Sequence, residues 1–182
     1  MRAFVAVFPP PEVRRALIQA AQRLRVIGEV RWSRPERAHL TLKFLGDVAE
    51  DDVGRVVKAL EPVCRRHRPF EARSSSFGAF PSAGRARIVW AGIGEGSEPL
   101  RALAEDVETS LAPLGFEREA RAYMPHLTLG RARGHPVSLE VVEMPPAVPG
   151  FIVRDVKLME SVLGGWSTYS TLATYPLSEG RD

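Results

Sequence analysis

Two segments of the chain alternate apolar and polar residues in the same way. Residues 39–42 are His-Leu-Thr-Leu, and residues 126–129 repeat them without change. In an extended strand successive side chains point to opposite faces, so each His shares a face with its Thr, and the two Leu share the other face. The pattern predicts two strands, each with its Leu face in the core and its His–Thr face lining an open surface.

The first half of the chain shows further strand and helix periodicities around the first repeat. Residues 2–8 are apolar and β-prone, which is typical of a buried strand. Apolar residues at helical spacing predict helices over 12–26 and 50–67. A single strand is expected over 70–77, and the many Gly, Ser and Pro residues of 78–84 favour a loop.

The second half of the chain repeats this order. Residues 87–93 predict a buried strand, residues 98–114 predict a helix, and the second His strand follows. Residues 135–150 carry four prolines and are expected to form a loop, and two last strands are expected over 153–163 and 169–175. The order strand, helix, His strand therefore occurs twice, and the second His lies 87 residues after the first in a chain of 182.

The repeated order predicts an α+β fold that arose by duplication. We expect two pseudo-symmetric lobes, each a mostly antiparallel sheet backed by helices, with the two His strands facing a central cleft. Residues 1–182 are expected to form a single domain and a monomer, with lobes that correspond roughly to the two halves of the sequence and a junction near residues 78–86.

Composition adds the compartment to this picture. With 45% hydrophobic and 26% charged residues, the chain has the composition of an ordinary globular protein. The single Cys64 excludes an internal disulfide and fits a reducing compartment. No apolar run approaches the ~18 residues of a membrane span, and the N-terminus lacks a signal-peptide pattern. We therefore expect a cytoplasmic protein that does not associate with membranes.

The basic residues are almost all arginine. Of the 25 Lys and Arg residues only Lys43, Lys58 and Lys157 are lysine, although the net charge is only +3. A GC-rich genome is the preferred explanation of this bias. The alternative is that Arg serves phosphate and base contacts through its planar fork of donors. The charge permits a nucleic-acid or nucleotide ligand but does not establish one.

The paired His–Thr faces indicate proton transfer at a phosphodiester. A lone His in a strand is most often a hydrogen-bonded structural residue, but an identical tetrapeptide at half-chain spacing favours a functional pair. Cleavage at phosphorus needs one proton taken from the nucleophile and one given to the leaving oxygen, and His39 and His126 can supply both. Thr41 and Thr128 can hydrogen-bond the phosphoryl oxygens.

A metal site is the rival use of two histidines. Zinc or iron would need at least three protein ligands, and neither motif carries Asp, Glu or Cys on its His face. Cys64 lies in the apolar stripe of a predicted helix, which also disfavours a Cys nucleophile. His67 and His135 lie in polar stretches that we expect to be exposed. We therefore expect no metal and no other cofactor.

Two aromatic residues near the motifs have two possible uses. Core packing is the preferred interpretation for both Phe44 and Trp90. Base stacking, worth ~1–3 kcal/mol per base, is the alternative.

The sequence around the two motifs resembles the two-histidine phosphoesterases. It is most similar to the bacterial and archaeal RNA 2′,3′-cyclic phosphodiesterases, also called 2′-5′ RNA ligases. The similar segments span nearly the whole chain and are residues 1–6, 31–35, 39–46, 77–81, 87–92, 125–131 and 158–161. Residues 164–167 depart from the Gly and Pro pattern of that family.

This resemblance implies a reaction and roles for individual residues. The implied reaction is metal-independent opening of RNA 2′,3′-cyclic phosphate ends to 2′-phosphate ends, with ATP-independent 2′-5′ ligation as its reverse. It implies that His39 is the catalytic acid and His126 the catalytic base. Thr41 and Thr128 would bind the phosphate, and Arg131 would lie beside it. The implied partner is RNA with cyclic phosphate ends, with tRNA halves among the candidates.

Two other functions stay open on the sequence. A small cyclic nucleotide or an ADP-ribose-type cyclic phosphate could take the place of RNA as substrate. A non-catalytic module that binds RNA ends would keep the same fold, although binding alone does not need two matched His–Thr faces. An assay that compares RNA ends with small cyclic nucleotides separates these functions.

Overall fold

Antiparallel strands make up most of the architecture in the computed structural model, which describes residues 1–140, 147–162 and 168–178. The helices and strands in these ranges are β1 (Arg2–Val7), α1 (Pro11–Ala21), β2 (Val26–Ile27), β3 (Val30–Trp32), β4 (Leu40–Asp47), α2 (Glu50–Arg65), β5 (Phe70–Ala72), β6 (Ser74–Phe80), β7 (Ile88–Ile93), α3 (Ser97–Leu111), β8 (His126–Ala132), β9 (Ser138–Leu139), β10 (Phe151–Val153), β11 (Asp155–Val162) and β12 (Thr168–Pro176). The unusual residues 164–167 and the end of the expected strand 153–163 lie outside the described residues. None of the described helices has the length and apolarity needed to cross a membrane.

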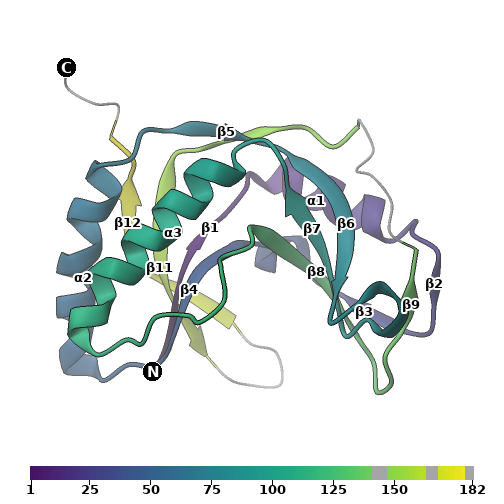
Figure 1. Cartoon of the computed structure of the whole chain (residues 1–182), viewed down its shortest axis with the longest axis horizontal. Helices are drawn as coiled ribbons and strands as arrows, with labels where there is room; N and C mark the ends of the chain where they lie inside the picture. Colours follow the sequence, from purple (N-terminus) through teal and green to yellow (C-terminus); the bar gives the residue numbers. More distant parts are fainter. Residues whose placement is uncertain (141–146, 163–167, 179–182) are drawn as a thin grey trace.

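One eight-stranded sheet dominates the described residues. Its order is β12-β11-β1-β4-β8-β7-β6, with β3 also paired to β8. The two motif strands, β4 and β8, are joined by a single register pair, Leu40 with Leu127. The sheet therefore consists of a β4 half (β12, β11, β1, β4) and a β8 half (β8, β7, β6, β3) that meet at the motifs (Figure 1). The predicted α+β class is confirmed, and the two expected sheets are halves joined at one point.

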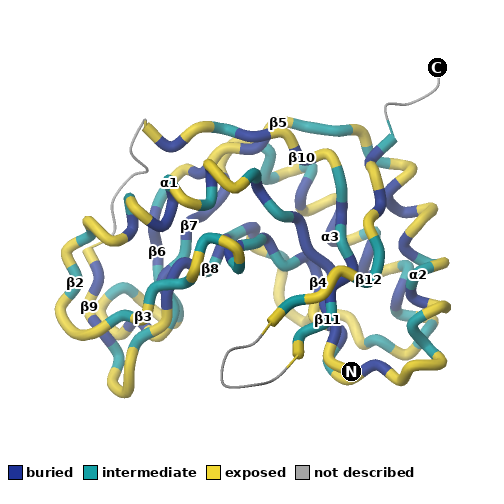
Figure 2. Tube along the Cα trace, turned by 180° about the vertical axis from the view of Figure 1, so that it is seen from behind, coloured by how far each residue is buried: buried dark blue, intermediate teal, exposed yellow. Residues whose placement is uncertain are grey.

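The helices pack on the Leu face of the sheet. Leu40 and Leu127 are fully buried in a core that also contains Leu17 of α1, Leu60 of α2 and Leu103 of α3. Burial of each such side chain contributes about 1.5–3 kcal/mol. Helices α2 and α3 lie together beside the β4 half, and α1 contacts β8. Figure 2 shows the buried positions along the central strands and on the helices. The three helices leave the opposite face of the sheet uncovered.

Each half-sheet takes elements from both halves of the sequence. β11 and β12 extend the β4 half beyond β1, and α3 packs on β4. Residues 78–86, the expected junction between lobes, instead span the end of β6 and the turn of the β6–β7 hairpin inside the β8 half. The lobes are therefore not the two sequence halves. The physical reason is that β1 would otherwise present an unpaired edge, which the C-terminal strands cover.

Three segments differ locally from the sequence-based expectation. The helix expected over 12–26 ends at Ala21, because Val26–Ile27 pairs with β9 inside the expected loop 135–150. The strand expected over 70–77 is two strands, of which β5 pairs with β10 and β6 pairs with β7. Both short ladders join residues far apart in the chain, so local periodicity carries no signal for them.

Gly78 explains why the expected loop over 78–84 begins late. Strand β6 continues to Phe80 and pairs Gly78 with Trp90 of β7. A Cβ at Gly78 would lie 2.2 Å from the Trp90 ring. The glycine is therefore a packing feature of a strand, where it makes room for a large neighbour.

Candidate active site

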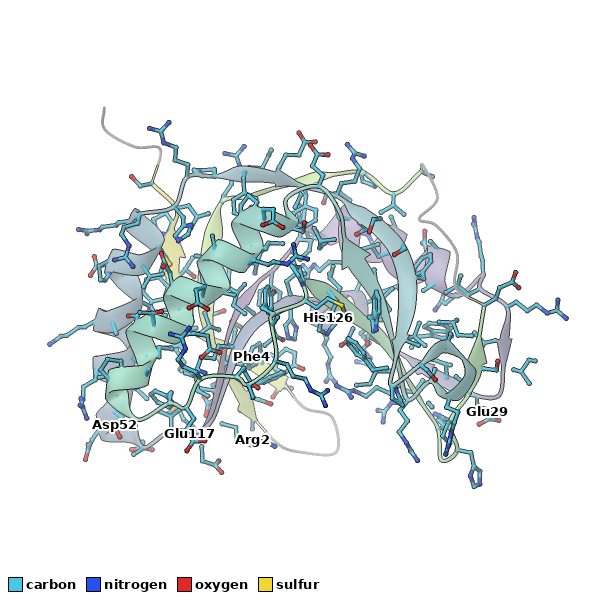
Figure 3. The ribbon with its side chains drawn as sticks, viewed as in Figure 1. Arg2, Phe4, Glu29, Asp52, Glu117 and His126 are labelled. Atoms are coloured by element: carbon cyan, nitrogen blue, oxygen red, sulfur yellow. The ribbon has the colours of Figure 1, made fainter. Side chains whose placement is uncertain are left out.

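The two motifs share one face of the sheet. β4 and β8 run antiparallel and pair at the first Leu of each motif. If this register continues by one residue in each direction, His39 lies opposite Thr128 and His126 lies opposite Thr41, on the face away from the Leu core. All four side chains are half-buried. We call this surface the His–Thr face, and Figure 3 places His126 near the centre of the molecule, where the two half-sheets meet.

Both imidazoles are held by the backbone in the same tautomer. Nδ1 of His39 lies 2.6 Å from the carbonyl oxygen of Arg37, and Nδ1 of His126 lies 2.7 Å from that of Met124. A carbonyl oxygen only accepts, so Nδ1 carries the proton and donates it in both rings. Nε2 of each neutral ring is therefore the nitrogen that can take a proton, and Nε2–H of each charged ring is the one that can give it.

Three aromatic rings enclose His39. The ring centroids of Phe4, Phe8 and Tyr169 lie 4.9, 5.2 and 5.4 Å from that of the imidazole. Burial is the main reason that the pKa of His39 falls from 6.5 to about 4, and the positive charge of Arg14 lowers it further. His39 is therefore neutral at pH 7 when no ligand is bound.

His126 has a lighter aromatic enclosure. The ring centroids of Phe80 and Trp90 lie 5.1 and 6.2 Å from its imidazole. Burial again lowers the pKa, while the hydrogen bond to the Met124 carbonyl opposes the shift. His126 is also one of the charges that lower the pKa of His39, so the two rings interact electrostatically.

A β-bulge re-aims the chain directly after the second motif. The pairing of β8 with β7 passes over Leu129, which is the extra residue. Leu129 and Gly130 are both buried, and the exposed Arg131 pairs with Ile88, two residues before Trp90, whose ring lies beside His126. Simple alternation would have put Arg131 on the Leu face, so the bulge turns it toward the face of the two histidines.

The same bulge follows the first motif. The pairing of β4 with β1 passes over Leu42, so Leu42 and Lys43 are both buried, at 4% and 3% exposure. Phe44 then lies on the His–Thr face, 65% exposed, with its ring centroid 6.3 Å from that of Phe4. The expectation that Phe44 packs in the core is wrong, because alternation without the bulge would group it with the Leu residues.

Beneath the first motif lies a buried ion pair. Nζ of Lys43 is 2.6 Å from a carboxylate oxygen of Glu108 in α3 and 2.7 Å from the carbonyl oxygen of Glu117. Glu117 belongs to the segment between α3 and the second motif. Lys43 therefore ties the first motif strand to the chain that leads into the second.

The remaining His and Cys residues take no part in this site. Nε2 of His67 lies 2.9 Å from a carboxylate oxygen of Asp106, and the side chain is only 15% exposed, so its expected exposure is wrong. His135 is exposed, as expected. Burial raises the pKa of the Cys64 thiol to about 12, which disfavours a thiolate nucleophile. Within the described ranges, no group of three or more His, Cys, Asp or Glu residues could hold a metal ion.

The aromatic residues around His39 were not anticipated from the sequence. Phe4 and Phe8 have the same parity along the first strand, a period-2 signal that could have placed them on one face. Tyr169 carries no such signal, because β12 reaches the site only through its pairing with β11. Apolar rings in strands are typical of cores, so their contact with a catalytic candidate is visible only in the fold.

Comparison with known proteins agrees with this geometry. Residues 7–90 match the family described as LigT like Phosphoesterase. A relative from Archaeoglobus fulgidus named RNA 2′,3′-cyclic phosphodiesterase is 35% identical over 166 residues, which cover 90% of this chain and 92% of the relative. A Thermotoga maritima relative of the same name is 32% identical over 154 residues and covers 80% of each chain.

Solved structures share this fold. A crystal structure of a Thermus thermophilus protein matches with a TM-score of 0.85 and 27% identity over 100% of both chains. The crystal structure of E. coli LigT complexed with 3′-AMP matches with a TM-score of 0.78 and 26% identity over 97% of both chains. With its duplicated His–Thr strands and these relatives, the chain belongs to the LigT-like phosphoesterase family.

Proposed function

We propose that this chain opens RNA 2′,3′-cyclic phosphate ends to 2′-phosphate ends by proton transfer between His39 and His126. The observation that supports the proposal most is the matched pair of imidazoles. Both rings have the same tautomer, and each comes directly before the Leu through which the two motif strands pair. The names of the relatives support the same substrate class.

In the proposed reaction one imidazole accepts a proton and the other donates one. One Nε2 accepts a proton from water while the water oxygen bonds to phosphorus. The bond from phosphorus to O3′ breaks, and the other imidazole gives its proton to O3′, which leaves phosphate on O2′. Thr41 and Thr128 donate hydrogen bonds to the phosphoryl oxygens, and Arg131 offsets the growing negative charge.

The two imidazoles differ in how well they suit each role. The family resemblance assigns His39 as the acid and His126 as the base. The pKa of His39, lowered to about 4, favours the exchanged roles in the ligand-free protein, because His39 is then neutral and suited to accept a proton. A phosphate anion bound between the rings raises both pKa values.

The same machinery also fits 2′-5′ ligation. If an RNA 5′-hydroxyl replaces water as the nucleophile, its oxygen bonds to phosphorus and O3′ leaves with the donated proton. The product is a 2′-5′ linkage, and no ATP is consumed. Metal independence follows from the proposed chemistry, since Arg131 and the two hydroxyls supply the charge stabilisation.

An end-group assay tests the proposal. RNA with a 2′,3′-cyclic phosphate end is expected to yield only 2′-phosphate, with equal rates in EDTA and in added Mg²⁺. The double variant His39→Ala/His126→Ala is expected to be inactive, whereas His135→Ala, at an exposed histidine outside the site, keeps full activity. A 3′-phosphate product, loss of activity in EDTA, or turnover by the double variant would contradict the proposal.

The substrate class needs a parallel arm in that assay. E. coli LigT is described in complex with 3′-AMP, so a mononucleotide is a ligand of that relative. Nucleoside 2′,3′-cyclic phosphates and an ADP-ribose-type cyclic phosphate are therefore assayed beside the RNA. We expect the RNA end to have the highest kcat/KM.

A further inference from the structure

Two cations converge on the aromatic ring beside His39. The Arg14 guanidinium carbon lies 5.9 Å from the Phe8 ring centroid, and Nζ of Lys157 lies 6.0 Å from the same centroid. The Phe8 centroid is itself 5.2 Å from that of His39. Arg14 comes from α1 and Lys157 from β11, so the fold brings two charges to the same ring from distant parts of the chain.

The position of Lys157 relates this cation pair to the reacting phosphate. Lys157 pairs with Ala6, and Ala6 pairs with Thr41 of the first motif. Two strand spacings, about 10 Å, therefore separate the backbones of Lys157 and Thr41. The residue between them on β1 is Ala6, so no large side chain of β1 separates Lys157 from Thr41. A long Lys side chain can reach an anion adjacent to the phosphate that Thr41 binds.

Neither cation is neutralised by a close carboxylate. Among the described residues, no Asp or Glu oxygen lies within 4.0 Å of the charged nitrogens of Arg14 or Lys157. Glu36 and Glu12 act on Arg14 only at longer range. A cation pair without counter-charge attracts an anion.

Arg14 is also held in place yet under-satisfied as a donor. Its Nη1 donates to the carbonyl oxygen of Pro35 at 3.1 Å, which fixes the guanidinium beside the segment that leads into the first motif. Its buried Nε–H has no acceptor among the described residues. Burial lowers the pKa of Arg14, so its charge is poorly solvated and an anion close by would stabilise it.

We propose that Arg14 and Lys157 bind a second phosphate of the substrate, the one on the 5′ side of the nucleotide that carries the cyclic phosphate. This inference rests on the proposed function and narrows its substrate class. A nucleoside cyclic phosphate with a free 5′-hydroxyl cannot use the subsite. A 5′-phosphorylated nucleotide or an RNA chain can, so the pair selects substrates with two phosphates.

Three substrates measure the contribution of the subsite. They are a nucleoside 2′,3′-cyclic phosphate, the same molecule with a 5′-phosphate, and a dinucleotide with a terminal cyclic phosphate. The wild type is expected to have a higher kcat/KM for the last two. Lys157→Gln should lower these two values about tenfold, the size of one charge-assisted hydrogen bond. It should leave the first substrate unchanged, and Lys157→Arg should restore most of the loss.

The control is Lys58→Gln, which removes the exposed lysine of α2 and should change none of the three values. The two phosphorylated arms separate the sources of the second phosphate, a terminal monoester or an internal diester. Equal wild-type kcat/KM for all three substrates overturns the inference. An equal loss on all three in Lys157→Gln overturns it as well, because Lys157 would then act on the reaction or on the fold.

A binding measurement judges the subsite separately from turnover. Calorimetry compares a nucleoside 2′-phosphate with the matching 2′,5′-bisphosphate. The wild type should bind the bisphosphate about tenfold more tightly, and Lys157→Gln should bind both equally. If the wild type opens none of the cyclic substrates, the proposed function fails. The subsite inference then stands or falls on this bisphosphate preference alone.

Discussion

The two half-sites of this protein have nearly the same backbone and different side chains. Each has the tetrapeptide His-Leu-Thr-Leu, an Nδ1 hydrogen bond to the carbonyl two residues earlier, and a bulge that passes over the second Leu. Two residues past that Leu, the chain returns to the His–Thr face. At this equivalent position the first half-site presents Phe44 and the second presents Arg131.

This difference teaches how a duplicated scaffold acquires two roles. In the proposed reaction the shared imidazoles give and take a proton, which is a symmetric task. In the same proposal the parts that differ contact the substrate, which is not symmetric. An exposed aromatic ring suits a base, and a guanidinium suits a phosphate. The aromatic enclosure differs too, since three rings surround His39 and two surround His126.

The largest expected effect comes from removing either imidazole. His39→Ala and His126→Ala should each lower kcat by about 10²–10⁴-fold, the usual contribution of a general acid or base. A diester with a p-nitrophenolate leaving group needs no protonation as it departs. It should therefore rescue the variant that lacks the acid and not the one that lacks the base.

The identity of the rescued variant shows which histidine is the acid and which is the base. Rescue of His39→Ala supports the roles that the family resemblance implies, and rescue of His126→Ala supports the roles that the low pKa of His39 favours. The matched control is His135→Ala, which should behave as the wild type with both leaving groups. Equal rescue of both variants would show that the half-sites are not specialised for acid and base roles.

A second prediction concerns the buried ion pair beneath the first motif. Under the first, Lys43 is paired with Glu108 in the core. Lys43→Ala leaves that carboxylate buried without a counter-charge and should cost about 3–5 kcal/mol of unfolding free energy. The double variant Lys43→Met/Glu108→Leu should recover most of this loss, as measured by urea denaturation.

The same variants test whether Lys43 also positions the second motif. Because Lys43 bonds to the Glu117 carbonyl, the double variant should be stable but should have a lower kcat than the wild type. Arg55→Ala, at an exposed surface pair with Asp52, is the control and should change stability by less than about 1 kcal/mol. Full activity of the double variant would limit Lys43 to a structural role.

The sequence predicted the repeated parts of this molecule from local patterns, whereas of the parts that differ only Arg131 was named, through the family resemblance. The two motif strands, the three helices and the α+β class follow from periodicity, because each is a local pattern. The residues of the site could be chosen because the tetrapeptide is repeated, so His39, Thr41, His126 and Thr128 were named. Period-2 alternation cannot record an extra residue in a strand, so the exposure of Phe44 was missed.

The parts of the fold that were missed depend on pairing across the chain. The β2–β9 and β5–β10 ladders have only two or three residues in each strand, too few for a periodic signal. The expected boundary between the lobes differs from the observed sheet for a related reason. Sequence order suggested a junction near residues 78–86, while the sheet places β11 and β12 beside β1. Which strands meet is decided by edge pairing and core burial, which a single local segment does not encode.

Removing the two side chains that differ, Arg131 and Phe44, tests the comparison with the next largest expected effect. Arg131→Ala should lower kcat/KM for every cyclic phosphate substrate by about 10–100-fold, since a charge-assisted contact contributes about 1.5–3 kcal/mol. Phe44→Ala should raise KM only for substrates with a base, by roughly 5–100-fold at ~1–3 kcal/mol per stacked base. Phe44→Trp is its control and should retain tight binding.

A substrate without a base separates the two effects. Ribose 2′,3′-cyclic phosphate should be affected by Arg131→Ala and unaffected by Phe44→Ala. If Phe44→Ala weakens this substrate as well, the ring supports the fold of the site. The proposed division between a base-binding and a phosphate-binding half-site would then be wrong.

The smallest expected effect is a shift in pH dependence that only the first half-site should show. Productive catalysis needs one neutral and one charged imidazole, so kcat/KM should follow a bell with its maximum on the acid side of pH 6.5, because both pKa values are lowered. The charge of Arg14 is among the causes that hold down the pKa of His39. Arg14→Gln should therefore raise that pKa and move the acid limb of the bell to higher pH.

Arg15→Gln, at the exposed neighbouring residue of α1, should leave both limbs in place. Measured with a nucleoside 2′,3′-cyclic phosphate that has no second phosphate, a shift of the alkaline limb alone would place the influence of Arg14 on His126 and remove this difference between the half-sites.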